Sequence, residues 1–282
     1  DLLGFQTESD KQAFLSSLAQ LTPLTPTPDG RWQAYGKTFS VGHYPIGIEP
    51  DAIRQLAGGP LPPKMAAIRD SLGEAKNIIA CERLDYSKGL PERFQAYEEF
   101  LEHYPQHRGR IRFTQIAPTS RGEVQAYQKI RQQLESEAGR INGKYGTLSW
   151  TPLYYLNQHF DRRLLMKIFR LTDIALVTPL RDGMNLVAKE YVAAQNADDP
   201  GVLILSRFAG AADELSGALI VNPYDRGEVA AAIDRATTMP LDERRERYQQ
   251  MMSVLTVQTI ERWRDSFLHD LKQLTGQHCE DH

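Results

Sequence analysis

A run of charged, amide and glycine residues marks the point where an apolar stretch gives way to a helical pattern, in the sequence LVTPLRDGMNLVAKEY. The run contains Arg181, Asp182, Gly183 and Asn185. If a helix begins near Asn185, the free backbone N–H groups at its start can bind a phosphate, and Gly183 lets a ligand approach the backbone. Asp182 and Glu190 then stand where carboxylates accept hydrogen bonds from sugar or ribose hydroxyls. This combination predicts a site for a nucleotide sugar.

Cations follow two other apolar runs that we expect to be strands. Arg83 and Lys88 lie in RLDYSKG, and Arg121 lies in PTSRG. Ligands of open parallel sheets bind beyond the carboxyl ends of the strands, so these cations should gather at one edge. They would repel one another there unless an anion is bound, and each charge-assisted hydrogen bond to it contributes roughly 1.5–3 kcal/mol. We expect Arg83 and Lys88 to hold a diphosphate.

Each cation has a plainer alternative role. Arg83 and Lys88 could pair with Asp85 and Glu82 on a solvated loop. Arg121 could be an ordinary residue in the first turn of a helix.

The acids and a nearby histidine also have plainer alternatives. Asp182 could cap the helix, and Glu190 could be a surface partner of Lys189 or Arg181. His159 could line a nucleobase slot, or serve as a cap or a core residue.

From about residue 76 the chain alternates short apolar runs with amphipathic helical segments, which predicts an α/β domain with a doubly wound parallel sheet. The predicted strands are 77–82, 110–117, 146–150, 173–179, 201–206 and 218–223. Helix starts are indicated at Pro91, at the capping box of Ser120 and Glu123, at Asp161, and at Asp225 with Glu228.

The remaining segments predict a second, partial sheet domain and a helical tail. Residues 1–74 contain two strands, two helices and a Gly/Pro-rich linker, AGGPLPPK, by their pattern. Residues 75–240 form the complete domain, and residues 241–282 are polar and helical. Because the chain starts with Asp1 in a strand-like stretch, we expect it to be part of a longer protein.

Composition and missing motifs exclude several classes of function. Thirty-three basic and 36 acidic residues give a net charge of -3, which argues against nucleic-acid and anionic-membrane partners. Two cysteines, Cys81 and Cys279, and the lack of any apolar run of about 20 residues suggest a cytoplasmic location. The sequence has no P-loop, GxGxxG, GxSxG or Asp-x-Asp motif, and its histidines lack ligand spacing, so we expect no cofactor and no metal.

Five segments together resemble one family. They are ERLDYSKGLPERFQAYE, QIAPTSRGEVQAYQ, GRINGKYG, PLYYLNQHF and LVTPLRDGMNLVAKEYVAAQ. They are similar to signature segments of the trehalose-6-phosphate synthases, retaining glycosyltransferases of family 20 with the two-domain GT-B architecture, and especially to the enterobacterial members. The resemblance implies one complete Rossmann-like donor domain at 75–240, and at 1–74 the end of an acceptor domain that is otherwise missing.

The resemblance also implies a role for each site residue. Arg83 and Lys88 bind the diphosphate of UDP-glucose, Arg121 reaches the phosphate of glucose 6-phosphate, and Phe160 meets the uracil through its backbone. Glucose and phosphates are held by Asp182, Gly183, Met184, Asn185, Leu186 and Val187, and the ribose by Glu190. Arg83, Lys88 and Asp182 are the implied catalytic residues.

The reaction implied is transfer of glucose from UDP-glucose to glucose 6-phosphate with retention, giving α,α-trehalose 6-phosphate and UDP. It proceeds without an enzymatic nucleophile or a metal, so it rests on positioning and on stabilising the leaving diphosphate. Because most of the acceptor half is missing, we expect this chain alone to bind UDP weakly and to form no product. A glucosylglycerol-phosphate synthase-like transferase and a non-catalytic regulatory module remain alternatives, and a homo-oligomer remains possible.

Overall fold

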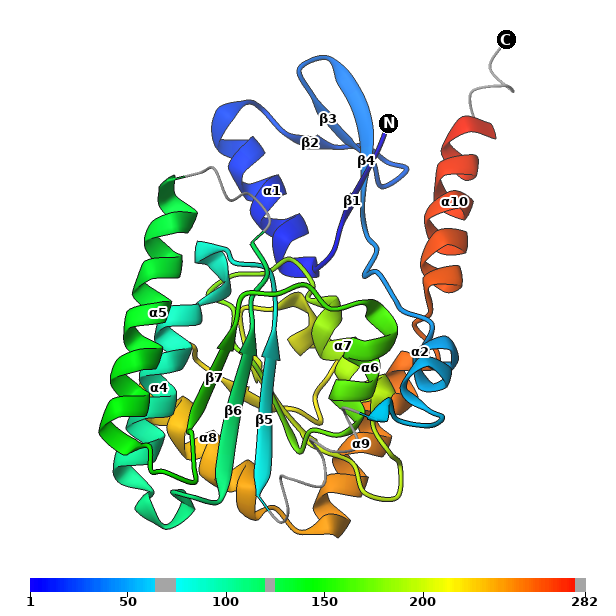
Figure 1. Ribbon diagram of the computed structural model, residues 1–282. Coiled ribbons are helices and arrows are strands. Elements are labelled where there is room, and N and C mark those ends of the chain that lie inside the picture. The colour runs from blue at the N-terminus through cyan, green and yellow to red at the C-terminus, as the bar shows by residue number, and fades with distance from the viewer. Residues whose placement is uncertain (64–74, 120–124, 277–282) are drawn as a thin grey trace. The chain divides into compact units, whose positions relative to one another are not determined.

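The computed structural model describes residues 1–63, 75–119 and 125–276 (Figure 1). Its contacts divide the chain into two compact units, Pro50–Val254 and Asp1–Glu49 with Leu255–His282. The domain ranges predicted from the sequence, 1–74, 75–240 and 241–282, stay a prediction.

The larger unit is built on a six-stranded, fully parallel sheet (Figure 1). Its strands are β5 (Lys76–Cys81), β6 (Ile111–Ile116), β7 (Leu153–Leu156), β8 (Ile174–Val177), β9 (Val202–Ser206) and β10 (Leu219–Val221). The order is β10-β9-β8-β5-β6-β7, so the chain builds outward from β5 in one direction and from β8 in the other. The predicted α/β class with a doubly wound domain is confirmed, and its switch point lies between β5 and β8.

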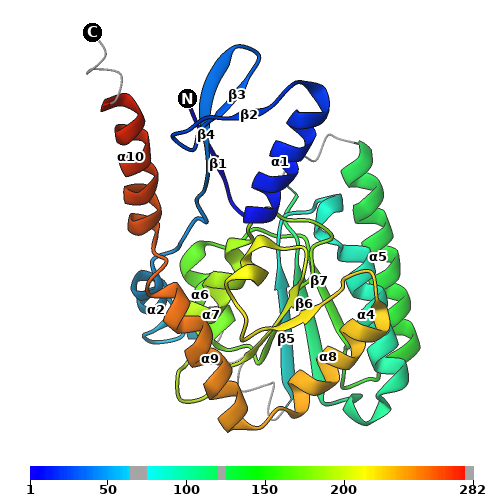
Figure 2. The same ribbon diagram turned by 180° about the vertical axis from the view of Figure 1, so that it is seen from behind.

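Helices cover both faces of this sheet (Figures 1 and 2). On one face α4 (Leu90–His103) packs against α5 (Gln125–Tyr145) and α8 (Arg226–Thr238). On the other face α6 (Arg162–Arg170) and α7 (Leu186–Ala194) pack together and against α2 (Pro50–Ala57). The last helix of the unit is α9 (Leu241–Leu255).

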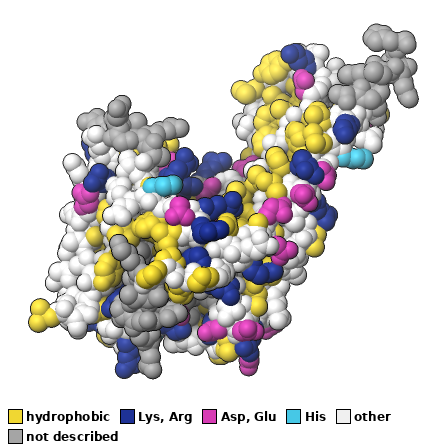
Figure 3. Space-filling model, turned by 45° about the vertical axis from the view of Figure 1, so that its right-hand side comes forward, with side chains coloured by type: hydrophobic (Ala, Val, Ile, Leu, Met, Phe, Trp, Pro, Cys, Tyr) yellow, Lys and Arg dark blue, Asp and Glu magenta, His cyan; other side chains and the backbone are white. Residues whose placement is uncertain are grey.

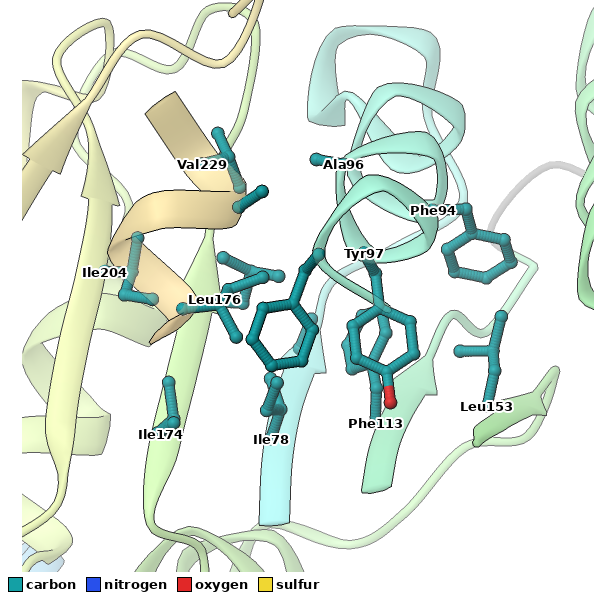
Figure 4. Packing of buried hydrophobic residues seen from close by; sticks show 14 of the residues in the cluster. Ile78, Phe94, Ala96, Tyr97, Phe113, Leu153, Ile174, Leu176, Ile204 and Val229 are labelled. Atoms are coloured by element: carbon teal, nitrogen blue, oxygen red, sulfur yellow. The ribbon is translucent and has the colours of Figure 1, made fainter. Parts of the chain in front are cut away.

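Aromatic residues of α4 form the centre of the core (Figure 4). Phe94 and Tyr97 point onto Phe113 of β6, with ring centroids 6.0 and 5.2 Å away. Ile78 pairs in register with Phe113 on one side and with Ile174 on the other. This packing fixes the central strands, and therefore the loops that leave their carboxyl ends.

Local helix signals predicted from the sequence agree with the structure. Asp161 caps α6 by accepting the Leu164 N–H, and Asp225 caps α8 by accepting the Glu228 N–H. Pro91 lies in the first turn of α4. The proposed capping box of Ser120 and Glu123 lies outside the described residues.

The predicted strand at 146–150 is wrong, because the third strand of the sheet is β7. Backbone hydrogen bonds between Thr147 and Trp150 close a turn instead. Leu148 is fully exposed, whereas Trp150 is buried and its indole donates to the Ile111 carbonyl. The apolar residues of this stretch therefore do not share the face of a strand.

The smaller unit contains β1 (Leu2–Phe5), α1 (Glu8–Leu21), β2 (Thr25–Pro26), β3 (Trp32–Ala34), β4 (Lys37–His43) and α10 (Ile260–Gly276). Its sheet has the order β1-β4-β3-β2, with β1 and β4 parallel and the others antiparallel. The two strands predicted for residues 1–74 are too few, because the structure also contains the β2–β3 hairpin. Tyr44 joins α10 to the sheet through a 2.7 Å hydrogen bond to Asp270 and an edge contact with Phe267.

Two properties of the described residues bear on the function classes. Acidic and basic side chains are interspersed on the face shown in Figure 3, in keeping with the small net charge. Within the described ranges no helix is both long and apolar enough to cross a membrane.

Candidate functional site

The loops that follow β5 and β8 meet at the switch point of the sheet. The N–H groups of Leu180 and Arg181 donate to the Ser87 carbonyl, at 2.8 and 3.3 Å. Gly89 allows this close approach, because its φ is 65° and a Cβ there would lie 2.8 Å from the Thr178 oxygen. Two segments about ninety positions apart in the sequence thus form one surface.

Lys88 and Asp182 are joined across this surface. The Lys88 Nζ lies 2.7 Å from the Asp182 Oδ2, and both side chains are less than one fifth exposed. Asn185 donates to the same oxygen at 2.9 Å. Lys88 therefore pairs with Asp182, whereas Asp85 instead accepts the backbone N–H of Ser87.

The helix start predicted near Asn185 is confirmed. Asn185, at φ 78°, caps α7 by accepting the Ala188 N–H, so capping is not the role of Asp182. The backbone N–H groups of residues 184–187 find no hydrogen-bond partner in the described part of the chain. Gly183 is exposed, and a Cβ there would meet nothing within 4 Å. The start of α7 thus presents free amides and the positive end of its dipole.

Arg83 lies in the loop after β5 that also carries Lys88. It follows β5, its side chain is exposed, and it makes no hydrogen bond or ion pair with any described residue. The alternative pairing with Asp85 or Glu82 is therefore not found, since Glu82 pairs with Arg93.

Glu190 lies on α7, one turn after Leu186. Its side chain is 18% exposed and accepts a 3.0 Å hydrogen bond from Arg162. Burial raises the pKa of Glu190, and Arg162 offsets only part of that effect. Lys189 is not its partner, because Lys189 is fully buried and pairs with Glu214.

The loop after β7 carries two further candidates. Phe160 is half-buried, and His159 is exposed, so His159 is not a core residue. His159 is not the cap of α6 either, since Asp161 has that role. Arg121, the predicted contact to an acceptor phosphate, lies outside the described residues.

Sequence reasoning missed Arg93, which lies directly beneath the switch point. Arg93 is 1% exposed and bonds to Glu82, Gln115, Thr178 and the Lys88 carbonyl. The available signal was a charged residue on the apolar face that α4 presents with Leu90, Phe94 and Tyr97.

Two further observations complete the description of possible sites. Among the described residues, no three or more His, Cys, Asp or Glu side chains are grouped so that they could hold a metal ion. A cavity of about 410 Å³ lies at the amino ends of β8 and β9, lined by Arg170, Asp173 and Arg244 among others. Its polar groups are hydrogen-bonded within the protein.

The strand order defines an α/β domain of the doubly wound class, with cationic side chains and free amides on the loops at its switch point. Comparison with known proteins identifies the family within this class. Residues 1–273 match Glycosyltransferase family 20, and the chain belongs to that family.

The most similar proteins include enterobacterial ones. A trehalose-6-phosphate synthase of Cronobacter sakazakii is 66% identical over 275 residues, which are 98% of this chain and 58% of that protein. One of Salmonella paratyphi B is 67% identical with the same coverage. The chain thus spans somewhat more than half the length of these relatives.

Solved structures agree with the family assignment. An E. coli protein of this kind bound with UDP-2-fluoro glucose superposes with a TM-score of 0.95 at 66% identity, covering 97% of this chain and 61% of that one. A Burkholderia xenovorans α,α-trehalose-phosphate synthase in complex with glucose-6-phosphate gives 0.93 at 49% identity, covering 96% and 61%. The predicted GT-B type of fold is confirmed.

Proposed function

We propose that this protein transfers glucose from UDP-glucose to glucose 6-phosphate with retention of configuration, giving α,α-trehalose 6-phosphate and UDP. Family membership and the ligands of the E. coli and Burkholderia relatives support the choice of substrates. The observation that carries the proposal is that Lys88 lies beside the free amides of α7 at the switch point, with the exposed Arg83 in the same loop as Lys88.

The donor is bound by groups that match its parts. Arg83, Lys88 and the amides of residues 183–187 bind the diphosphate, because both positive charge and N–H donors converge there. Asp182 accepts hydrogen bonds from the glucose hydroxyls. Glu190 and the backbone of Phe160 hold the ribose and the uracil.

The transfer step needs no enzymatic nucleophile and no metal. The bond between the anomeric carbon and the phosphate oxygen breaks, and the acceptor hydroxyl forms the new bond on the same face. The departing phosphate oxygen takes the proton of that hydroxyl. The protein lowers the barrier by stabilising the charge that develops on the diphosphate, which is the task of Arg83, Lys88 and the start of α7.

The phosphate of the acceptor is bound by Arg121, and the reaction takes place in the cytoplasm. The 282-residue polypeptide by itself spans 58% of the length of its relatives. We therefore expect it to bind UDP weakly and to release no trehalose 6-phosphate.

Titration calorimetry of this chain with UDP tests the donor site. Arg83→Ala should weaken UDP binding about 10- to 150-fold, the equivalent of roughly 1.5–3 kcal/mol for one charge-assisted bond. Arg235→Ala is the matched control, because Arg235 is 59% exposed and pairs with Glu243 on the surface. Equal UDP affinity in the Arg83 variant and the control would contradict the proposal. UDP release by a protein of the relatives' full length that contains this chain, measured with glucose 6-phosphate and with glycerol 3-phosphate, tests the acceptor.

A further inference from the structure

A buried guanidinium connects the parts of the candidate site from below. Arg93 Nε donates to the Thr178 hydroxyl at 2.9 Å, and Nη2 donates to the Lys88 carbonyl at 3.0 Å. Nη1 donates to Gln115 at 2.9 Å and also pairs with Glu82. These acceptors belong to the ends of β5, β6 and β8 and to the turn that carries Lys88.

We propose that Arg93 is a positioning residue that holds the Lys88 turn against the end of β8, so that Lys88 and the amides of α7 face one diphosphate. The inference rests on the proposed function, because it concerns how the same donor site is held in place. Arg93 is buried, so it acts through Lys88 and Thr178 without touching the donor.

Within the Lys88 turn, the Ser87 N–H donates to the Asp85 carboxylate at 2.9 Å and the Lys88 N–H to the Asp85 carbonyl at 3.2 Å. The Lys88 carbonyl is held by Arg93, and the neighbouring Ser87 carbonyl by Leu180 and Arg181. Arg93 also fixes Thr178, the first residue after β8, at the point closest to Gly89. Arg93 thus adds a buried side-chain link between the two loops to the backbone hydrogen bonds of Ser87.

Stability alone does not explain a buried arginine at this place. A buried ion pair often contributes no more to stability than apolar residues of similar volume. The network is nevertheless complete, since Gln115 also donates to the Glu82 carboxylate at 3.1 Å. The planar guanidinium fork can reach acceptors on several elements in fixed directions, which a lysine cannot do. We therefore explain the arginine at position 93 by its ability to orient the two loops.

A double variant separates positioning from folding. Glu82→Gln with Arg93→Met removes both buried charges together, so we expect it to melt within a few degrees of the unaltered chain. Amide exchange in peptides covering residues 85–89 and 178–181 should accelerate by about tenfold or more. UDP affinity should fall by about tenfold or more, while UMP affinity falls by less than about threefold, because Lys88 would lose its place beside the second phosphate.

A surface pair on the same helix supplies the matched control. Glu98→Gln with Arg140→Met removes the pair between α4 and α5 and should leave amide exchange at 85–89 and UDP affinity unchanged. Arg93→Lys keeps the charge opposite Glu82 and should show the faster exchange and the weaker UDP binding as well. If the double variant does not fold, Arg93→Lys alone tests the positioning role of Arg93.

The outcomes distinguish this inference from the proposed function. Exchange and UDP affinity equal to those of the unaltered chain in a folded Arg93 variant would overturn the positioning role. If the unaltered chain binds no UDP but exchange at 85–89 still rises in the variants, the donor assignment fails and the positioning of the turn stands.

Discussion

Gly89 offers the sharpest test of how the two loops of the site are joined. Its φ of 65° is a conformation that side chains with a Cβ rarely adopt. A Cβ would also lie 2.8 Å from the Thr178 carbonyl oxygen and 3.1 Å from the Leu180 Cδ2. Gly89→Ala must therefore strain the backbone and push the Lys88 turn away from the end of β8.

The two costs can be separated with a second glycine of the same unit. Gly109 has a φ of 80°, but a Cβ there would meet nothing within 4 Å. Gly109→Ala should cost about 1–2 kcal/mol for the backbone conformation alone. Gly89→Ala adds a steric cost of about 1–3 kcal/mol, because the opposing atom is backbone and cannot rotate away.

Thermal unfolding followed by circular dichroism measures the difference. At about 2–4 °C per kcal/mol for a unit of this size, Gly89→Ala should melt about 2–12 °C below Gly109→Ala. UDP affinity should fall in the Gly89 variant only. The reasoning is refuted if the two variants melt together and bind UDP equally well.

Three further predictions follow from single contacts. Asp182→Asn removes the carboxylate that pairs with Lys88 and that, under the proposed function, accepts hydrogen bonds from the glucose hydroxyls. The dissociation constant of UDP-glucose should therefore rise relative to that of UDP in calorimetry. An unchanged ratio would argue against sugar binding by Asp182. Burial raises the pKa of Glu190, so the folded chain holds that proton more tightly, and stability falls as the pH rises from 4.5 through the raised pKa. Glu190→Gln should therefore melt higher than the unaltered chain at neutral pH, with the gap closing below pH 4.5, and no gap at neutral pH would contradict this. Asp225→Ala removes the cap that accepts the Glu228 N–H and should cost about 1 kcal/mol in urea unfolding, with UDP binding unchanged.

Features fixed by neighbouring residues could be predicted from the sequence. Asp161 and Asp225 cap helices as expected, because a cap depends on a side chain and an N–H three positions later, and a helix starts near Asn185 as expected. The strand rhythm gave the doubly wound parallel sheet for a similar reason, but not the order of its strands. The stretch 146–150 was mistaken for a strand because it contains apolar residues. In the structure Leu148 is exposed and Trp150 is buried, and the stretch forms a turn.

Contacts between distant segments could not be predicted in the same way. The partner of Lys88 lies 94 positions away, and nothing in the local sequence favours Asp182 over Asp85. Arg93 has acceptors on separate strands whose order only the folded sheet determines. The residues of the site were therefore foreseeable as a set, while their pairing was not.

The pairing of Lys88 with Asp182 has a consequence for donor binding under the proposed function. While the pair persists, Lys88 offers a diphosphate little net charge, so binding should be accompanied by an exchange of partners on Lys88. Asn185 donates to the same Asp182 oxygen and caps α7, so it can retain the carboxylate near the helix start when Lys88 turns away. The carboxylate released from Lys88 is then available to the sugar hydroxyls. Because Arg93 holds the Lys88 carbonyl, we expect this exchange to involve side-chain rotation and not movement of the turn.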